Sequence, residues 1–255
     1  MKTNGRDTNG GTLCGVPGAT CSSGDWRQAY ANYLVAYVKF YAEAGVKLTH
    51  LGFLNEPDYT ASYASMQSNG NQAADFIKVL GATLDANNLT DVGINCCESM
   101  GWGNQVNMLN NIKSAGLEGR LKAVTSHSYS SGPSGAMNTK VPVWLSEQCD
   151  LNGQWSTAWY SSGGAGDGLT WANNIYSAVT NQNIGGYIWW EGAQWPNRES
   201  VFSVLLEGST GWTLSGPAAA PDCTHLSSTI VADLHLQPTP TKSSFASIIA
   251  PIRTR

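Results

Sequence analysis

The feature that most constrains this chain is an alternation of helical and strand-like segments. Four segments carry apolar residues at steps of three and four positions, which is the period of an amphipathic helix. They are residues 26–45, 71–88, 104–116 and 166–182. Shorter apolar runs predict strands at residues 46–57, 91–98, 121–130, 141–150 and 184–195. Strands that alternate with helices predict an α/β fold with a parallel sheet and helical crossovers.

The helical periods also predict which side chains face the core. In the first helix the expected inner stripe is Trp26, Tyr30, Tyr33, Leu34, Tyr37, Val38 and Tyr41. In the second helix it is Ala73, Phe76, Ile77, Leu80 and Leu84. Both stripes should pack against the sheet or a neighbouring helix.

The predicted strands all finish in polar or aromatic residues. This is the layout of the active face of a (β/α)8 TIM barrel, which needs eight strands and about 250 residues. The chain has 255 residues but shows only five such strands, so we expect the three missing strands to precede Met1. The expected fold is a partial (β/α)8 barrel formed by residues 1–199.

The last part of the chain differs in kind from the rest. Residues 200–255 are rich in Pro, Ser and Thr and show no sustained apolar period. Such a composition predicts an irregular or disordered tail. We assign no function to this segment.

Composition excludes some partners and favours others. The net charge is −4 and no basic run is present, which argues against nucleic acid as a partner. No stretch is long and apolar enough to span a membrane. The plentiful tryptophans and tyrosines combine flat faces with hydrogen-bonding tips, which suits an uncharged polysaccharide.

The six cysteines suggest disulfides rather than a metal site. Cys14 and Cys21 bracket a short Gly- and Pro-containing loop and can close a ring, and one of Cys96 and Cys97 is expected to bridge to Cys149. Buried free thiols are the alternative. No C-x-x-C pair occurs and the histidines are scattered, so we expect no zinc site. Disulfides favour a secreted protein, although no signal peptide is present at the N-terminus.

Two glutamates end predicted parallel strands and can converge across the active face. They are Glu56, after the run LGFLN, and Glu147, after VWLS. Hydrolysis of a glycoside needs one protonated carboxyl to release the leaving oxygen and one carboxylate to attack the anomeric carbon or activate water. Mutual repulsion and burial should keep the acid of the pair protonated near neutrality.

Other polar and aromatic residues at the strand ends are candidates for holding a sugar or the nucleophile. They are Asn55, Tyr59, Glu98, His127, Tyr129, Trp189 and Trp190. For Glu98 two roles are open, contact with the substrate or support of another site residue. Asn55 can bond the hydroxyl next to the reacting carbon, and His127 and Tyr129 can hold the nucleophile. At most one of the two tryptophans should face the site, and the other should pack on a helix. For His127 the alternative is a hydrogen-bonded core histidine. No cofactor or metal is implied.

The segments that carry these residues resemble a known family. HLGFLNEPDY, VTSHSY, VWLSEQ and YIWWEGAQW resemble the fourth, sixth, seventh and eighth strands of glycoside hydrolase family 30, and MKTNG resembles the end of its third strand. The fungal xylanase branch is the most similar, through the CGVPG loop and the TASYASMQS segment. The resemblance implies retaining hydrolysis of a β-linked glycan, with Glu56 as acid/base and Glu147 as nucleophile. Retention requires the two carboxyl groups to lie about 5–5.5 Å apart.

The chain also departs from the family at both ends. Met1 aligns inside the barrel, so residues 1–199 would cover about strands four to eight. The family's last helix and its small β-sandwich side domain are not found after Glu199, and a mispredicted gene model would explain this. The expected activity is endo-β-1,4-xylanase or glucuronoxylanase hydrolysis of xylan, by a monomer if the protein is complete. A β-1,6-galactanase or another β-glycanase is one alternative. The other is a catalytically dead fragment with weak sugar binding, because an incomplete barrel would expose apolar strand edges.

Overall fold

The computed structural model describes residues 1–149, 159–160 and 168–190. The predicted tail, residues 200–255, lies outside this part of the chain. The elements follow one another as α1 (Arg27–Glu43), β1 (His50–Gly52), α2 (Gly70–Ala86), β2 (Gly93–Ser99), α3 (Trp102–Ser114), the short 3₁₀ turn η1 (Glu118–Arg120), β3 (Leu121–His127), β4 (Val143–Glu147), α4 (Gly168–Gln182) and β5 (Gly186–Tyr187). The expected alternation of helices and strands is confirmed.

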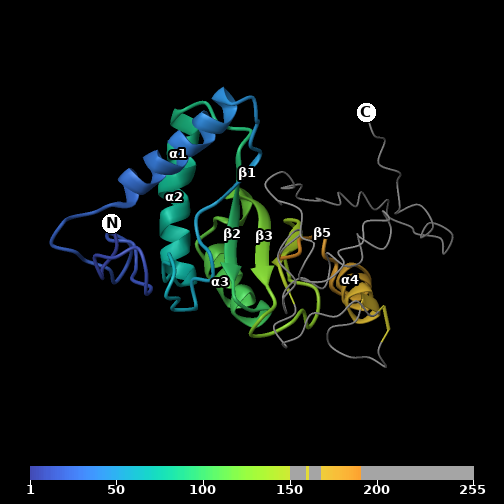
Figure 1. The fold of residues 1–255 in the computed structure, drawn as a ribbon. Coiled ribbons are helices and arrows are strands. Elements are labelled where there is room, and N and C mark those ends of the chain that lie inside the picture. The colour runs from blue at the N-terminus through green and yellow to red at the C-terminus, as the bar shows by residue number, and fades with distance from the viewer. Residues whose placement is uncertain (150–158, 161–167, 191–255) are drawn as a thin grey trace, which may run out of the picture.

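The five strands form one parallel sheet in the order of the sequence, β1-β2-β3-β4-β5. Every neighbouring pair is parallel. The predicted α/β fold with a parallel sheet is therefore confirmed. The strands run toward the lower side of Figure 1, so the residues that follow them gather at that edge. Residues 128–142, which link β3 to β4, contain no helix.

Helices flank the sheet at both ends, and two of them pack against its strands. Figure 1 shows α1 and α2 beside each other at the β1 end of the sheet, and α4 at the β5 end. Helices α2 and α3 pack against each other, and both contact β2. An aromatic cluster joins α1, α2 and the residue after β1, with the ring of Phe76 5.1 Å from Tyr30 and 5.0 Å from Phe53. This cluster fixes the segment that leads from β1 toward Glu56.

Helix α2 follows its predicted pattern. All five residues of its expected stripe are buried. Its N-terminus has a capping box, in which the Asn69 side chain accepts from the backbone of Gln72 and the Gln72 side chain accepts from the Asn69 backbone. Two otherwise unpaired backbone donors are thereby satisfied. Local capping and long-range packing agree in this helix.

Helix α1 differs from its prediction. The buried residues are Ala31, Leu34, Val35 and Val38. Tyr33, Tyr37 and Tyr41 are exposed, so the expectation that they face the core was wrong. The apolar pattern of this helix extends well beyond the arc of roughly 100° that can contact a neighbour. Small and branched side chains occupy that arc, and the tyrosines lie outside it.

The strand that leads to Glu56 is shorter than predicted. Strand β1 ends at Gly52, four residues before the carboxylate. Beyond it the backbone finds other partners, because Tyr30 Oη donates to the carbonyl of Phe53 at 2.8 Å and the amide of Glu56 donates to the carbonyl of Glu98 at 2.8 Å. Glu56 itself has a left-handed backbone with φ of 43°. It therefore lies on a turn after the strand rather than at the strand's tip.

The cysteines pair only partly as expected. Cys14 and Cys21 form a disulfide, as predicted. Cys96 and Cys97 bond with each other, so the predicted bridge from this pair to Cys149 is wrong. The sequence could not decide between these pairings, because it shows that the two cysteines are adjacent but not how far Cys149 lies from either. Among the described residues, no helix is long and apolar enough to span a membrane.

The aromatic cluster leads to a test of the fold. Replacing Phe76, which is 2% exposed, with Ala should lower the free energy of unfolding by about 3–5 kcal/mol because it leaves a cavity between α1 and α2. The matched control is Phe40→Ala in α1, where the side chain is 66% exposed and the change should stay within about 0.5 kcal/mol. Urea denaturation followed by circular dichroism measures both. Equal destabilisation by the two changes would contradict this packing.

Candidate active site

Four neighbouring strands each bring one ionisable residue to the same edge of the sheet. Glu98 lies near the end of β2, His127 ends β3, and Glu147 ends β4. Glu56 joins them from the turn after β1. His127 and Glu147 are direct partners in the β3–β4 pairing. The carboxyl ends of parallel strands thus collect three carboxylates around one imidazole, as is typical of active faces in α/β folds.

His127 lies at the centre of this cluster and is almost completely buried. Its Nδ1 is 3.1 Å from Oε1 of Glu56. Its Nε2 is 3.3 Å from Oε2 of Glu98 and 3.6 Å from Oε2 of Glu147. Burial lowers the pKa of the imidazole, but hydrogen bonds to Glu56 and Glu98 and the charge of Glu147 outweigh it and raise the pKa to about 9. His127 therefore carries a positive charge at neutral pH and donates from both nitrogens.

Glu56 is held by two donors. His127 bonds its Oε1, and Tyr63 Oη donates to its Oε2 at 3.0 Å. Burial raises the pKa of this carboxyl, but the hydrogen bonds from His127 and Tyr63 and the His127 charge bring it below its usual range. Tyr63 is a site residue that was not predicted from the sequence. The residue comes from a loop and is brought close by the turn at residues 56–59, where the Tyr59 amide donates to the Glu56 carbonyl at 2.9 Å.

Glu147 has a different environment. Its Oε1 accepts a hydrogen bond of 3.0 Å from Tyr129 Oη, which also lies 3.6 Å from the Cys149 sulfur. Burial raises the pKa of the Glu147 carboxyl, and the charges of Glu56 and Glu98 add to this effect. His127 and Tyr129 oppose it without cancelling it. Burial and the negative charge of Glu147 also raise the pKa of Tyr129, so its hydroxyl stays a donor.

The two carboxylates are close enough to act on one bond. One oxygen of Glu56, one oxygen of Glu147 and one nitrogen of His127 lie within 4.8 Å of one another. Their resting charges differ from the expectation that burial and repulsion keep Glu56 protonated. Glu56 is the more acidic of the pair because two groups donate to it, whereas Glu147 is raised by burial and by two neighbouring carboxylates.

The three residues bond one another in the free protein. Each imidazole nitrogen of His127 lies at hydrogen-bonding or ion-pair distance, 3.1–3.6 Å, from a carboxylate oxygen. Such an arrangement can hold and move protons.

The predicted aromatic residues separate into two groups. Trp189 packs edge-on against Trp171 of α4, with ring centroids 4.5 Å apart. Trp190 is exposed, and its amide donates to the Gln148 carbonyl at 3.0 Å, next to Glu147 in the chain. Tyr59 is also exposed. Trp189 thus packs on α4, whereas Trp190 is exposed beside the chain that follows Glu147.

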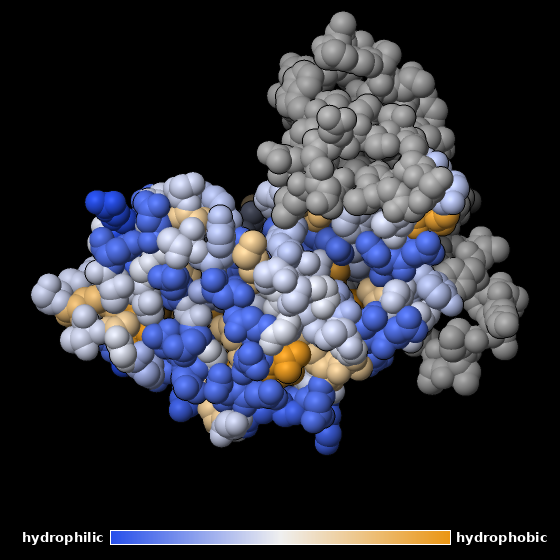
Figure 2. Space-filling model, turned by 90° about the horizontal axis from the view of Figure 1, so that it is seen from below, coloured by the Kyte–Doolittle hydropathy of each residue, from blue (hydrophilic) through white to orange (hydrophobic). Residues whose placement is uncertain are grey.

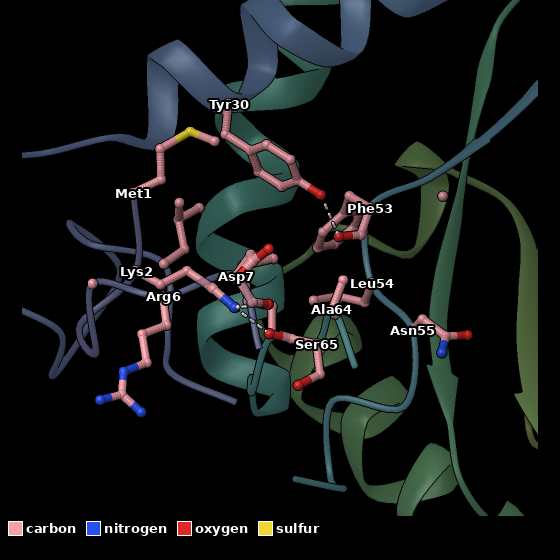
Figure 3. Close-up of a pocket in the computed structure, with 14 residues that line it drawn as sticks. Met1, Lys2, Arg6, Asp7, Tyr30, Phe53, Leu54, Asn55, Ala64 and Ser65 are labelled. Carbon is pink, nitrogen blue, oxygen red and sulfur yellow. Dashed lines mark hydrogen bonds between the residues drawn. The ribbon is translucent and has the colours of Figure 1, made fainter. Parts of the chain in front are cut away.

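A large cavity adjoins the site on the β1 side. It has a volume of about 660 Å³ and lies between the N-terminal segment, Tyr30 of α1 and residues 52–55 (Figure 3). Asn55 is the predicted site residue that lines it. Lys2 Nζ crosses the region and donates to the carbonyls of Asp7 at 2.7 Å and Gly10 at 2.9 Å.

The surface around the strand ends is mostly polar. Figure 2 looks at the lower side of Figure 1, toward which the strands run. The described part of this face is largely hydrophilic, with small and separate hydrophobic patches. Such a surface favours a polar ligand over a lipid or a large apolar partner.

Comparison with known proteins shows what the chain is similar to. No family model matches the chain. Among solved structures, the catalytic domain of xylanase C of glycoside hydrolase family 30 from Talaromyces cellulolyticus is 48% identical, with a TM-score of 0.74 over 76% of this chain. A subfamily 8 xylanase of the same family from Clostridium acetobutylicum is 23% identical, has a TM-score of 0.58 over 85% of this chain and supports the fold alone. The chain spans 45% and 53% of these two structures, or about half their length. The chain is therefore related to the xylanases of glycoside hydrolase family 30.

Proposed function

We propose that this chain carries the catalytic carboxylates of a retaining glycoside hydrolase that cleaves β-linked xylan. The observation that carries the proposal is the approach of Glu56 and Glu147 within 4.8 Å at the strand ends. Retaining enzymes have carboxyl groups about 5–5.5 Å apart, whereas inverting enzymes need about 6.5–9.5 Å to admit a water. The 48% identity to a xylanase supports xylan as the glycan.

In the proposed reaction the two carboxylates act in two steps. A Glu147 oxygen attacks the anomeric carbon, the bond to the leaving oxygen breaks, and Glu56 gives its proton to that oxygen. Glu56 then takes a proton from a water, whose oxygen attacks the anomeric carbon and releases the Glu147 carboxylate. Tyr129 donates to Glu147 before the attack and orients it.

The reactive form needs a proton on Glu56 and a negative charge on Glu147, which is the reverse of the shifts in the free protein, where the pKa of Glu56 is lowered and that of Glu147 is raised. The outer oxygen of Glu56, Oε2, faces Tyr63 and not the imidazole. The positive charge of His127 stabilises the ionised form of Glu147 in the reactive state.

The wider organisation follows from the same proposal. The described sheet corresponds to five consecutive strands of a (β/α)8 barrel within a catalytic unit of residues 1–199, and residues 200–255 are not assigned to that unit. The protein acts as a monomer on a polysaccharide outside the cell. The Cys14–Cys21 disulfide supports the extracellular location. Asn55, Tyr59 and Trp190 are the proposed sugar contacts.

Chemical rescue tests the two roles. Glu56→Ala should reduce kcat on xylan by about 10²–10⁴-fold because the general acid is lost. It should keep its first step on aryl xylosides with activated leaving groups, which depart without a proton. Azide should then restore turnover and yield a β-xylosyl azide. Glu147→Ala should be inactive on both substrates, and azide should yield the α-azide. Product anomers are read by proton NMR.

The control for rescue is Glu118→Ala, a change at a carboxylate bonded to Thr139 away from the site. It should keep normal rates and give no azide product. If azide gave the α-product with Glu56→Ala and the β-product with Glu147→Ala, the two roles would be exchanged. Normal rates on xylan with Glu147→Ala would overturn the assignment, and a panel of β-1,6-galactan and other β-glycans would show whether the substrate is another glycan.

Tyr63→Phe should extend activity toward alkaline pH. The Tyr63 hydroxyl lowers the pKa of Glu56, so removing it raises that pKa. Glu56 must be protonated in the first step, and activity is lost as pH rises through its pKa. The basic limb of kcat/KM against pH should therefore move upward in this variant. Tyr33→Phe, at an exposed tyrosine of α1, is the matched control, and its limb should not move. A downward shift in Tyr63→Phe would show that Tyr63 does not act through Glu56.

A further inference from the structure

The proposed reaction assigns no role to Glu98, the third carboxylate of the cluster. Its backbone carbonyl accepts from the Glu56 amide at 2.8 Å. Its Oε2 accepts from the Ser146 hydroxyl and lies 3.3 Å from Nε2 of His127. The side chain is only 17% exposed. Glu98 thus contacts the backbone of the proposed acid and the imidazole beside it, and its side chain points into the protein.

Strand β2 is irregular at Glu98, and this irregularity sets the direction of the Glu98 side chain. The β2–β3 register shifts between Cys97 and Ser99, so Glu98 stands outside the ladder. Its backbone is left-handed, with φ of 58°. The amides of Cys97 and Ser99 on either side both donate to the buried Oε1 of Gln105, at 3.2 and 3.3 Å. Bulges next to active sites re-aim a side chain, and α3 holds this bulge in place through Gln105.

This geometry decides which groups His127 can bond. The ionisable groups that face the imidazole are Glu56 from the turn after β1, Glu98 from β2 and Glu147 from β4, with Tyr129 edge-on at 5.8 Å. Nε2 donates to Glu98, which leaves Nδ1 to donate to Glu56. Without the negative charge of Glu98, His127 can lose the proton on Nε2 and become a neutral imidazole.

We propose that Glu98 is a positioning residue, which keeps His127 doubly protonated and fixes the Glu56 backbone, rather than a residue that binds the sugar. The inference deepens the proposed function and rests on it for the reaction. The contacts themselves exist without substrate. Any effect of Glu98 should therefore act through His127 and Glu56 and be visible in the free protein.

The test is Glu98→Gln, examined first without substrate. ¹⁵N NMR of the histidine rings follows each imidazole with pH, and the His127 signals are assigned by their loss in His127→Gln. In the unchanged chain His127 should remain an imidazolium through neutral pH. In Glu98→Gln it should lose its proton at a clearly lower pH. Glu43→Gln, at an exposed carboxylate ending α1, is the matched control and should titrate like the unchanged chain.

Kinetics then separate positioning from sugar binding. In Glu98→Gln, kcat should fall about 10- to 100-fold, the loss expected from one hydrogen bond to a charged group, with KM unchanged and the basic limb of the pH profile displaced from that of the unchanged chain. A raised KM with unchanged pH limbs and an unchanged His127 titration would overturn the proposal. If no variant hydrolyses any glycan but His127 still shifts, the positioning role stands and the proposed function fails. If Glu98→Gln does not fold, Glu98→Ala, which leaves room for water, is measured in the same way.

Discussion

A charged imidazole that is almost entirely out of water is the interaction on which the rest of this site depends. Burial alone would remove the proton from His127, and three carboxylates, from the turn after β1 and the ends of β2 and β4, keep it there. The single positive charge of His127 also offsets the repulsion among Glu56, Glu98 and Glu147, which lie close together. Removing any member would leave a buried charge without its counterpart, so the four groups act together.

The fold supplies this arrangement through parallel pairing. Strands β1 to β4 are consecutive in the sheet, so each adds one residue to the same edge at the spacing of neighbouring strands. The packing of Phe76 against Tyr30 and Phe53 fixes the chain as it leaves β1 and carries Glu56 back to the carbonyl of Glu98. The core between α1 and α2 thus determines the position of the proposed acid.

Much of this could be predicted from the sequence where local and long-range preferences agree. Helix α2 has both an apolar period and a capping box, and the meeting of Glu56 with Glu147 follows from parallel strands alone. Features that depend on contacts distant in sequence could not be predicted. Tyr63 reaches the site through the fold of a loop, and Glu98 turns inward because of a bulge held by Gln105. The difference in pKa between Glu56 and Glu147 likewise depends on hydrogen-bond donors that only the three-dimensional arrangement brings together.

The central claim is that Glu147 forms a covalent bond to the sugar while Glu56 moves the proton. Trapping of the intermediate tests it most directly. A 2-deoxy-2-fluoro xylobioside with an activated leaving group slows both steps but keeps the first accessible, so the glycosyl-enzyme should accumulate. Peptide mass spectrometry should then find the fluorosugar on Glu147. A label on Glu56 or Glu98, or hydrolysis of xylan with inversion at the anomeric carbon and no trapped sugar, would contradict the account.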